Sequence, residues 1–394
     1  MNKRSVKDLE VQGKRVLVRV DFNVPVKDGE VTDDTRIRRA LPTIRHLLSE
    51  GARPALISHL GRPKGEPDPK YAMDPVARRL EELLGESVTK LDTATGPEAG
   101  NALDGMSGGV VLLENSRFYP GETKNDAGFA EELAAPFDLY VNDAFGAAHR
   151  AHATTVGVAE RLSSAAGLLM EAEIDYLDGV LQDPRRPFVA ILGGAKVSDK
   201  LGVIESLLGV ADSLLVGGAM CFTFFKAKGY EIGNSLVEDD YLEEAKRLMD
   251  AAGERLVLPV DVVVADAMED GVETETVPVD GIPAGKMGLD VGPESVEAFR
   301  GQISGASTIF WNGPMGVFEI DAFAKGTEGV ARAVAEASEG GATSVIGGGD
   351  SVAAVNKLGL DDKMSHISTG GGASLEYVEG KDLPGVAVLP EKRS

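Results

Sequence analysis

The stretch that decides the fold runs Arg186-Pro-Phe-Val-Ala-Ile-Leu-Gly-Gly-Ala-Lys-Val-Ser-Asp-Lys200. Its apolar run, Phe188 to Leu192, is typical of a strand buried on both faces. Two glycines end the run, and we expect Ser198 to cap a helix that follows. Glycines between a strand and a helix let backbone N–H groups approach a ligand, and a helix N-terminus favours anions. If the helix begins early, Lys196 and Lys200 project from one side of it. This stretch alone fits a phosphate site and an ordinary strand–turn–helix equally well.

Three later stretches repeat the junction of an apolar strand with a glycine turn: Leu214-Leu-Val-Gly-Gly-Ala219, Thr343-Ser-Val-Ile-Gly-Gly-Gly-Asp350 and His366-Ile-Ser-Thr-Gly-Gly-Gly372. In an open parallel sheet such turns lie at the carboxyl edge, where ligands bind. None of the glycine clusters reads G-x-G-x-x-G or G-x-x-x-x-G-K-[ST]. The nearest miss, Gly281-Ile-Pro-Ala-Gly-Lys286, is one residue short and lacks the hydroxyl for a metal. The pattern predicts a phosphate-binding sheet that is neither of the dinucleotide type nor of the P-loop type.

Composition narrows the class of protein. The 394 residues allow two or three domains. A single cysteine, Cys221, rules out an internal disulfide and suits a reducing compartment, and we expect neither a signal peptide nor a membrane span. The net charge of −23 argues against nucleic acid and anionic membranes as partners. Residues 1–165 carry 22 Lys and Arg against 25 Asp and Glu, so most of the negative charge lies in residues 166–394.

Strand and helix patterns alternate along both halves, which favours a parallel sheet in each. In the first half we expect strands at 14–20, 54–58, 109–113 and 137–141, with helices between them. A helix over 168–181 would link the two halves. In the second half, we expect a helix at 241–252, a strand at 255–264 and a helix at 329–338, with alternation continuing to about residue 372. We expect the apolar tail, residues 383–389, to pack against a hydrophobic core elsewhere in the chain.

Five cationic or titratable side chains of the first half gather near predicted strand ends or, for the first of them, at the start of a helix: Arg36, His59, Arg62, Arg117 and Arg150. We call these the arginine set. Because the carboxyl ends of parallel strands meet at one edge, the set predicts a cluster of guanidinium groups for a small, multiply charged anion. Asp21 and Asn23, after the first strand, are suited to reading hydroxyl groups. Any one of the arginines alone is more often solvated surface.

The motifs, taken in order, resemble phosphoglycerate kinase over essentially the whole chain. They are Val18-Arg-Val-Asp-Phe-Asn-Val-Pro25, His59-Leu-Gly-Arg-Pro63, Leu113-Glu-Asn-Ser-Arg-Phe118, Asn142-Asp-Ala-Phe-Gly-Ala-Ala-His-Arg-Ala-His152, Gly193-Gly-Ala-Lys-Val-Ser-Asp-Lys200, Trp311-Asn-Gly-Pro-Met-Gly-Val-Phe-Glu319 and Ile346-Gly-Gly-Gly-Asp-Ser351. Small departures, such as Tyr119-Pro120 and Ser351 where the family often has threonine, do not touch a residue assigned to the chemistry.

The resemblance implies two doubly wound, Rossmann-like α/β domains joined by a helix, with the C-terminal tail returning to the first domain. Residues 1–167 and 376–394 would bind 3-phosphoglycerate, and residues 168–375 would bind the nucleotide. The implied triose-binding residues are Asp21, Phe22, Asn23, Arg36, His59, Leu60, Gly61, Arg62, Arg117 and Arg150. The implied nucleotide-binding residues are Gly193, Lys200, Gly217, Gly218, Leu289, Gly292, Asn312, Pro314, Glu319, Gly348, Gly349, Asp350 and Ser351, and Asp350 would hold Mg²⁺.

The implied reaction is reversible phosphoryl transfer between ATP and the carboxylate of 3-phosphoglycerate, as in glycolysis and gluconeogenesis. A carboxylate nucleophile needs no general base, so what the reaction requires is alignment and positive charge on the transferring group. Lys196 and Arg36, one from each domain, resemble the donors that meet across the cleft, with Lys200 beside them. Backbone N–H groups of Gly370, Gly371 and Gly372 would complete the anion site. Bringing the two substrates together would require the domains to close.

Three other functions remain open at this stage. Another two-domain α/β transferase, such as an acyl-phosphate kinase for a different small acid, would bind ATP but not 3-phosphoglycerate. A nucleotide sensor of this fold would keep the glycine turns but lose the arginine set or Lys196, and both are present. A scaffold would need neither. From the resemblance we expect a cytoplasmic monomer; the sequence does not give the physiological direction, the kinetic constants or any regulator.

Overall fold

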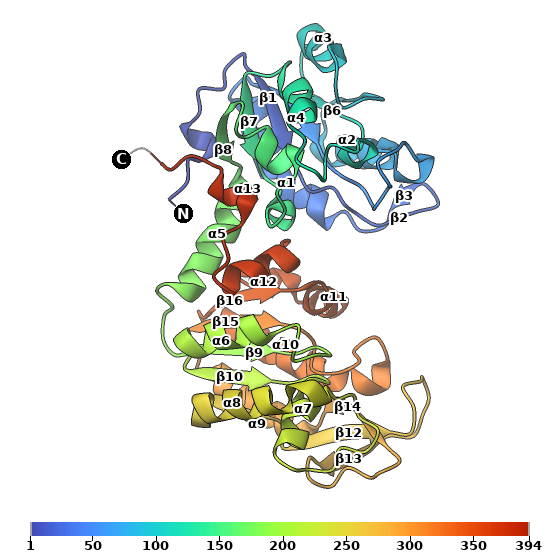
Figure 1. The fold of residues 1–394 in the computed structure, drawn as a ribbon, viewed down its shortest axis with the longest axis vertical. Helices are drawn as coiled ribbons and strands as arrows, with labels where there is room; N and C mark the ends of the chain where they lie inside the picture. The colour runs from blue at the N-terminus through green and yellow to red at the C-terminus, as the bar shows by residue number, and fades with distance from the viewer. Residues whose placement is uncertain (1, 393–394) are drawn as a thin grey trace. The chain divides into compact units, whose positions relative to one another are not determined.

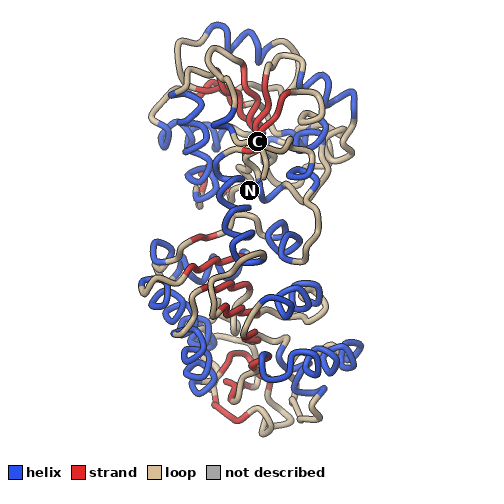
Figure 2. The backbone as a smooth tube through the Cα atoms, turned by 90° about the vertical axis from the view of Figure 1, so that its left-hand side faces the viewer, coloured by secondary structure: helices blue, strands red, loops and turns tan. Residues whose placement is uncertain are grey.

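The computed structural model describes residues 2–392, which form two compact units (Figure 1). The first unit runs to Asp175 and takes up the chain again at Asp382, and the second is Tyr176–Lys381. The sequence-based boundaries lie at 167 and 376. In each unit the strands lie between helices (Figure 2). No helix of the described chain combines the length and apolar character needed to cross a membrane.

The first unit is built on a six-stranded sheet whose paired strands all run parallel. Its spatial order is β5-β6-β4-β1-β7-β8. The strands are β1 Arg15–Arg19, β4 Arg53–Ile57, β5 Val88–Lys90, β6 Val110–Leu112, β7 Leu139–Asn142 and β8 Ser163–Ala166, with a hairpin of β2 Val26–Lys27 and β3 Glu30–Val31. The helices are α1 Thr35–Ser49, α2 Asp74–Leu84, α3 Glu98–Gly105, α4 Ala127–Ala134 and α13 Pro384–Ala387. From β1 the chain winds first to one side and then to the other, so the winding changes direction beside β1, where open α/β sheets bind ligands.

The second unit repeats this plan and adds a small sheet. Its parallel sheet has the order β11-β10-β9-β15-β16-β17, and an antiparallel sheet has the order β13-β12-β14. The strands are β9 Phe188–Leu192, β10 Ser213–Val216, β11 Leu256–Val257, β12 Asp261–Ala265, β13 Glu275–Pro278, β14 Met287–Val291, β15 Thr308–Asn312, β16 Thr343–Gly347 and β17 His366–Ile367. The helices are α6 Leu201–Val210, α7 Cys221–Ala227, α8 Leu242–Ala252, α9 Pro293–Ser304, α10 Lys325–Glu339, α11 Gly349–Lys357 and α12 Gly372–Val378. Here the winding reverses between β9 and β15.

Two doubly wound parallel sheets confirm the predicted fold class. Strand β9 has the predicted bounds, and all five of its residues are buried. The linking helix α5, Leu168–Leu181, also has its predicted bounds. In unit 1, Ile37, Ile44 and Leu47 of α1 are fully buried in a core shared with strands β1, β4 and β7, because they recur at helical spacing on one face.

Two local predictions for the second unit are wrong. Ser198 does not cap a helix, since α6 begins only at Leu201 and the Ser198 hydroxyl donates to Glu238 instead. The helix therefore starts after both lysines and does not place them on one of its sides. The single strand expected over 255–264 is two strands, β11 and β12, in different sheets. Pro259 lies in the gap between them and has no N–H for a sheet hydrogen bond.

The C-terminal tail returns to the first unit, as predicted. Leu383 and Leu389 are 2% exposed, and Val386 is also buried. The N–H of Gly385 donates to the carbonyl of Ala148 at 2.8 Å, and Asn142 Nδ2 donates to the carbonyl of Gly385 at 3.0 Å. The tail thus completes the core of the first unit beside the end of β7.

The carboxyl group that follows β7 makes the stability of the first unit depend on pH. Burial raises the pKa of Asp143 to about 7, although the N–H groups of Leu169 and Met170 donate to its Oδ1. Between about pH 4 and pH 7 the native carboxyl keeps a proton that the unfolded chain releases. The free energy of unfolding contributed by this group therefore falls as the pH rises through this range.

We predict that Asp143→Asn removes this dependence, because an amide does not titrate. Relative to the variant, the native chain should lose on the order of 2–3 kcal/mol of unfolding free energy between pH 5 and pH 8. Urea unfolding of both proteins at the two pH values measures the difference. Equal pH dependence in the two proteins would show that Asp143 is already ionised in the native state at pH 5.

Candidate functional site

The first candidate site lies at the carboxyl edge of the first unit's sheet, where charged side chains surround one carboxylate. Arg36 NH1 donates to Asp21 Oδ2 at 2.9 Å, and Asp21 is 8% exposed. Burial would raise the pKa of Asp21, but the charges of Arg36 and Arg19, the nearby His59 ring and the N–H of Asn23 lower it below its usual value. Asp21 therefore stays ionised and holds Arg36 in place. The structure thus brings together three predicted site residues that come from different segments.

His59 follows β4 and is 6% exposed. Its pKa lies well below the usual value, first because of burial and then because of Arg19, Arg117 and Arg36, against the opposing effect of Asp21. At neutral pH the ring is therefore uncharged. Positive charge at this site comes from guanidinium groups, while His59 supplies a neutral hydrogen-bonding group.

The loop after His59 is hydrogen-bonded to two other segments of the site, those of Asn23 and Arg117. Asn23 Oδ1 accepts the N–H of Gly61 at 2.8 Å, and Arg117 NH1 donates to the Gly61 carbonyl at 2.8 Å. Gly61 has φ +62°, and a Cβ there would lie 2.2 Å from Cε1 of Tyr71. Any other residue would be strained at this φ and would displace the Tyr71 ring. The loop therefore fixes the relative placement of Asn23 and Arg117.

The other predicted triose residues divide into exposed cations and buried apolar groups. Arg62 and Arg150 are exposed, so their guanidinium groups are accessible to an anion. Phe22 and Leu60 are 0% and 3% exposed, so their side chains belong to the core and only their backbones are near the site. The charges of the arginine set influence neighbouring groups. The charge of Arg62 lowers the pKa of Arg117, and the charges of Arg117 and Arg150 lower the pKa of His152.

The second candidate site is a cavity of about 950 Å³ within the second unit. Five of the predicted nucleotide residues line it: Gly218, Leu289, Pro314, Glu319 and Asp350. Apolar groups missed by the sequence reasoning complete its walls: Phe222, Met315, Val317 and Ile320. A mainly apolar cavity with a few polar groups at its margin suits a flat ring that carries a polar chain.

The remaining predicted nucleotide residues support the cavity or lie at its edge. The N–H of Gly193 donates to the carbonyl of Asn312 at 2.9 Å, which joins the ends of β9 and β15 where the winding reverses. Ser351 Oγ accepts the N–H of Gly313 at 2.6 Å. Gly193, Gly217, Gly292, Gly348, Gly349 and Ser351 do not line the cavity. Gly292 instead packs against Asp261, and a Cβ on it would lie 2.2 Å from Asp261 Oδ2.

A polar pair, between the end of β15 and the residue before α6, has unused hydrogen-bonding capacity. Lys200 Nζ donates to Asn312 Oδ1. Among the described residues, Asn312 Nδ2 is buried without a hydrogen-bond partner. Burial lowers the pKa of Lys200, while Asp199, Asp350 and Glu379 act in the opposite direction. An amide donor and an ammonium side by side are suited to the oxygens of a phosphate group.

The last predicted catalytic residues lie near these turns. Lys196 is exposed, three residues after Gly193. Gly370 is buried and its N–H donates to Ser368 Oγ at 3.0 Å, so this N–H is already used inside the protein. Gly371 is partly exposed and Gly372 is exposed, and both remain accessible at the start of α12.

The described residues do not form a metal site of their own. In residues 2–392 no three His, Cys, Asp or Glu side chains come together in a way that could hold a metal ion. Asp350 is exposed and lines the cavity. One carboxylate with phosphate oxygens is the usual setting for protein-bound Mg²⁺, so the residues present fit this ion only together with a nucleotide.

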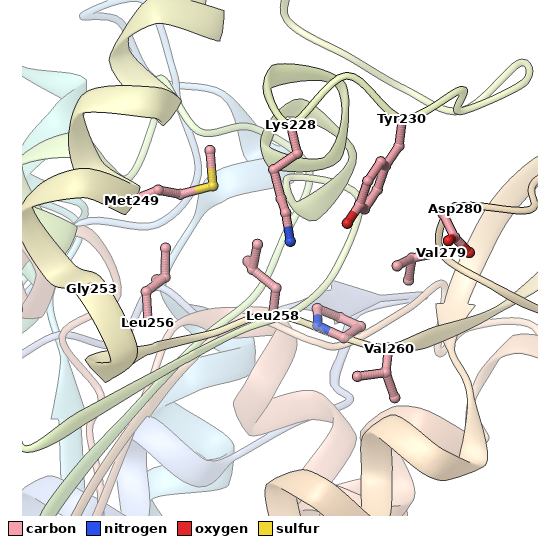
Figure 3. A pocket seen from close by; sticks show the side chains of 10 residues that line it. Lys228, Tyr230, Met249, Gly253, Leu256, Leu258, Val260, Val279 and Asp280 are labelled. Carbon is pink, nitrogen blue, oxygen red and sulfur yellow. The ribbon is translucent and has the colours of Figure 1, made fainter.

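A further cavity in the second unit, of about 480 Å³, contains none of the predicted residues. Figure 3 shows Lys228 and Tyr230 directed into it above Leu256, Leu258 and Val260. The Lys228 ammonium lies 5.1 Å from the centre of the Tyr230 ring. Its lining contains one cation, Lys228, and no pair of polar groups like Lys200 and Asn312.

Sequence reasoning missed two residues that organise the first site. Asn115 Oδ1 accepts the N–H groups of Leu60 and Arg117, and its Nδ2 donates to the carbonyls of Leu60 and Tyr71. Arg19 contacts His59 from within β1. A signal for Arg19 was present, because this charged residue stands between the apolar residues Val18 and Val20 at the end of β1.

Comparison with known proteins identifies similar chains over the whole length. The family model of phosphoglycerate kinase matches residues 6–381. A phosphoglycerate kinase of Rubrobacter xylanophilus is 80% identical over 392 residues, which covers 100% of this chain and 99% of that protein. One of Thermosipho africanus is 56% identical over 398 residues, covering 100% and 99%.

Solved structures of phosphoglycerate kinases are also similar to this chain. The phosphoglycerate kinase structure from Coxiella burnetii has a TM-score of 0.87 at 41% identity, and it covers 98% of each chain. The structure from Pyrococcus horikoshii OT3 has a TM-score of 0.85 at 34% identity, with the same coverage. On this evidence the chain belongs to the phosphoglycerate kinase family.

Proposed function

We propose that this chain transfers a phosphoryl group reversibly between ATP and the carboxylate of 3-phosphoglycerate, giving 1,3-bisphosphoglycerate and ADP. The observation that carries the proposal is the first site, where Arg36, Arg117 and the neutral His59 are arranged around the Asp21 carboxylate. Such a cluster suits a small anion with a phosphate and a carboxylate, while Asp21 and Asn23 suit its hydroxyl group. The acceptor carboxylate is already a nucleophile, so no general base is required.

In this proposal the second unit binds the nucleotide. The base would lie between Gly218 and Leu289, and Glu319 would accept hydrogen bonds from ribose hydroxyls. Lys200 and Asn312 would bind phosphate oxygens, because Asn312 Nδ2 has a free donor position among the described residues. Gly193, Gly217, Gly292, Gly348, Gly349 and Ser351 would shape the backbone around the cavity.

Catalysis in this account is electrostatic. Lys196 from the second unit and Arg36 from the first would donate to the oxygens of the transferring group, with accessible N–H groups at Gly371 and Gly372. Asp350 would hold Mg²⁺ together with the nucleotide phosphates, and the ion would neutralise charge on those phosphates. An oxygen of the triose carboxylate would attack the γ-phosphorus in line, while the bond from that phosphorus to the bridging oxygen breaks and ADP leaves; no proton is transferred in this step.

Because the two sets of residues belong to different units, direct transfer requires them to be brought together with water excluded. We predict that binding of both substrates contracts the protein. Small-angle scattering of the free chain, of each binary complex and of the ternary complex measures this. The largest decrease in radius of gyration should occur only with both ligands present. Identical profiles in all four states would contradict closure.

A coupled assay for ADP formation with 3-phosphoglycerate and magnesium–ATP tests the function itself. We expect turnover that depends on both substrates and on the metal. ATP binding without binding of 3-phosphoglycerate would favour a kinase for another small acid. The single, buried Cys221 and the net charge of −23 support our proposal of a cytoplasmic enzyme that uses neither an anionic membrane nor nucleic acid. We also propose that it is a monomer.

A further inference from the structure

A buried arginine beside the first site makes an uncommon contact. Arg19 lies in β1 and is 0% exposed. Its NH2 atom is 3.0 Å from His59 Nδ1, its Nε donates to Thr154 Oγ1 at 2.9 Å, and its NH1 donates to the Val20 carbonyl. Within residues 2–392 no carboxylate lies in ion-pairing distance of this guanidinium. A fully buried cation is therefore directed at a neutral ring rather than at an acid.

The countercharge of Arg19 is one hydroxyl group away. Thr154 Oγ1 donates to Glu122 Oε1 at 2.6 Å, and the Thr154 N–H donates to Glu122 Oε2 at 3.0 Å. Glu122 is also fully buried, and Ser116 Oγ donates to its Oε1 at 3.3 Å. This chain of bonds fixes the guanidinium plane without using the NH2 donor, which is left for His59. A purely structural cation would be expected to pair directly with Glu122.

Arginine can only donate hydrogen bonds, and this determines which nitrogen of the His59 ring carries the proton. A guanidinium has five N–H donors and no acceptor, so His59 Nδ1 must accept from Arg19. A neutral imidazole with an accepting Nδ1 carries its proton on Nε2. Protonation of Nδ1 would place two donors and two positive charges against each other.

We propose that Arg19 is a positioning residue that holds His59 in the Nε2–H tautomer, so that the ring offers the triose a neutral hydrogen-bond donor. A donor at this place complements a carboxylate, phosphate or hydroxyl oxygen of the substrate, whereas the other tautomer would present a lone pair to it. The part of the inference that concerns the substrate rests on the proposed function. The tautomer itself does not.

Long-range ¹H–¹⁵N correlation spectra of the ligand-free protein, labelled at histidine, test the tautomer at pH 7. Loss of one set of signals in His59→Gln assigns the ring. We expect a pyridine-like Nδ1 and a protonated Nε2 for His59. A protonated Nδ1, or a doubly protonated ring, would overturn the proposal, and this outcome is independent of any activity.

Two variants test the role of the arginine. In Arg19→Met we expect a mixture of tautomers and a rise of about tenfold or more in the KM for 3-phosphoglycerate, with the KM for ATP unchanged. In Arg19→Lys, which keeps a cation with donors only, the Nε2–H tautomer should persist. If Arg19→Met keeps the native tautomer and the native KM, the proposal is wrong.

Two further measurements separate a failure of the tautomer proposal from a variant that does not fold and from a failure of the proposed function. Should Arg19→Met fail to fold, Thr154→Val loosens the guanidinium while leaving it present, and it should broaden or shift the His59 signals. Unchanged signals in that variant would count against the proposal. If the native chain does not phosphorylate 3-phosphoglycerate at all, the proposed function fails, and the spectra still decide the tautomer.

Discussion

Replacement of Lys196 by alanine should lower kcat by about 10²-fold or more while changing nucleotide binding little. Lys196 is exposed and follows the glycine turn at the end of β9. An ammonium placed to meet charge that develops on the transferring phosphoryl group stabilises the transition state more than the ground state. Stopped-assay turnover and ATP affinity, measured on the same preparation, separate the two effects.

Lys228→Ala is the matched control, because it removes an exposed ammonium from the same unit at the cavity of Figure 3. Turnover of this variant should be close to that of the native chain. Near-normal turnover of Lys196→Ala would show that the assignment of Lys196 is wrong. An equal loss in both variants would indicate that only the overall charge of the unit matters.

Replacement of Gly218 by alanine should weaken ATP binding by about 10-fold to 100-fold. Gly218 lines the cavity and has φ +69°, a conformation that side chains rarely adopt. An added Cβ would lie 2.5 Å from both the nitrogen and the oxygen of Gly194, and 2.9 Å from the Pro314 oxygen. These are backbone atoms, so relief requires a shift of the two turns that border the cavity.

Isothermal titration with magnesium–ATP measures the change in affinity, and circular dichroism checks the fold. Gly209→Ala serves as the control, since it lies inside α6 with no atom within 4 Å of the new Cβ. That change should leave affinity unaltered and stabilise the helix by up to about 1 kcal/mol. Native affinity in a folded Gly218→Ala would place the nucleotide elsewhere.

The sequence predicted the parts of the fold that depend on local pattern. The run Phe188–Leu192 is apolar throughout and became a central strand, and Leu168–Leu181 is rich in helix formers and became α5. The small antiparallel sheet was not predicted, because β13 is short, half polar and mostly exposed. Its pairing with β12 depends on tertiary contacts that no local pattern contains.

The site shows the same division between local and long-range information. The arginine set could be predicted because all its members except Arg36 follow strands that must end at one edge of a sheet. The contact of Arg19 with Thr154 could not, since 135 positions separate the two residues. The apolar walls at Phe222 and Met315 were also missed, because apolar residues in a sequence do not reveal whether they face a core or a cavity.

The central claim is that each unit holds one substrate by its own residues. Isothermal titration of 3-phosphoglycerate and of magnesium–ATP against two variants, Arg36→Ala and Gly218→Ala, tests it most directly. The account predicts a crossed result: Arg36→Ala loses affinity for 3-phosphoglycerate and keeps that for ATP, and Gly218→Ala does the reverse. Loss of ATP binding in Arg36→Ala, or of 3-phosphoglycerate binding in Gly218→Ala, would contradict the assignment of the substrates to the two units.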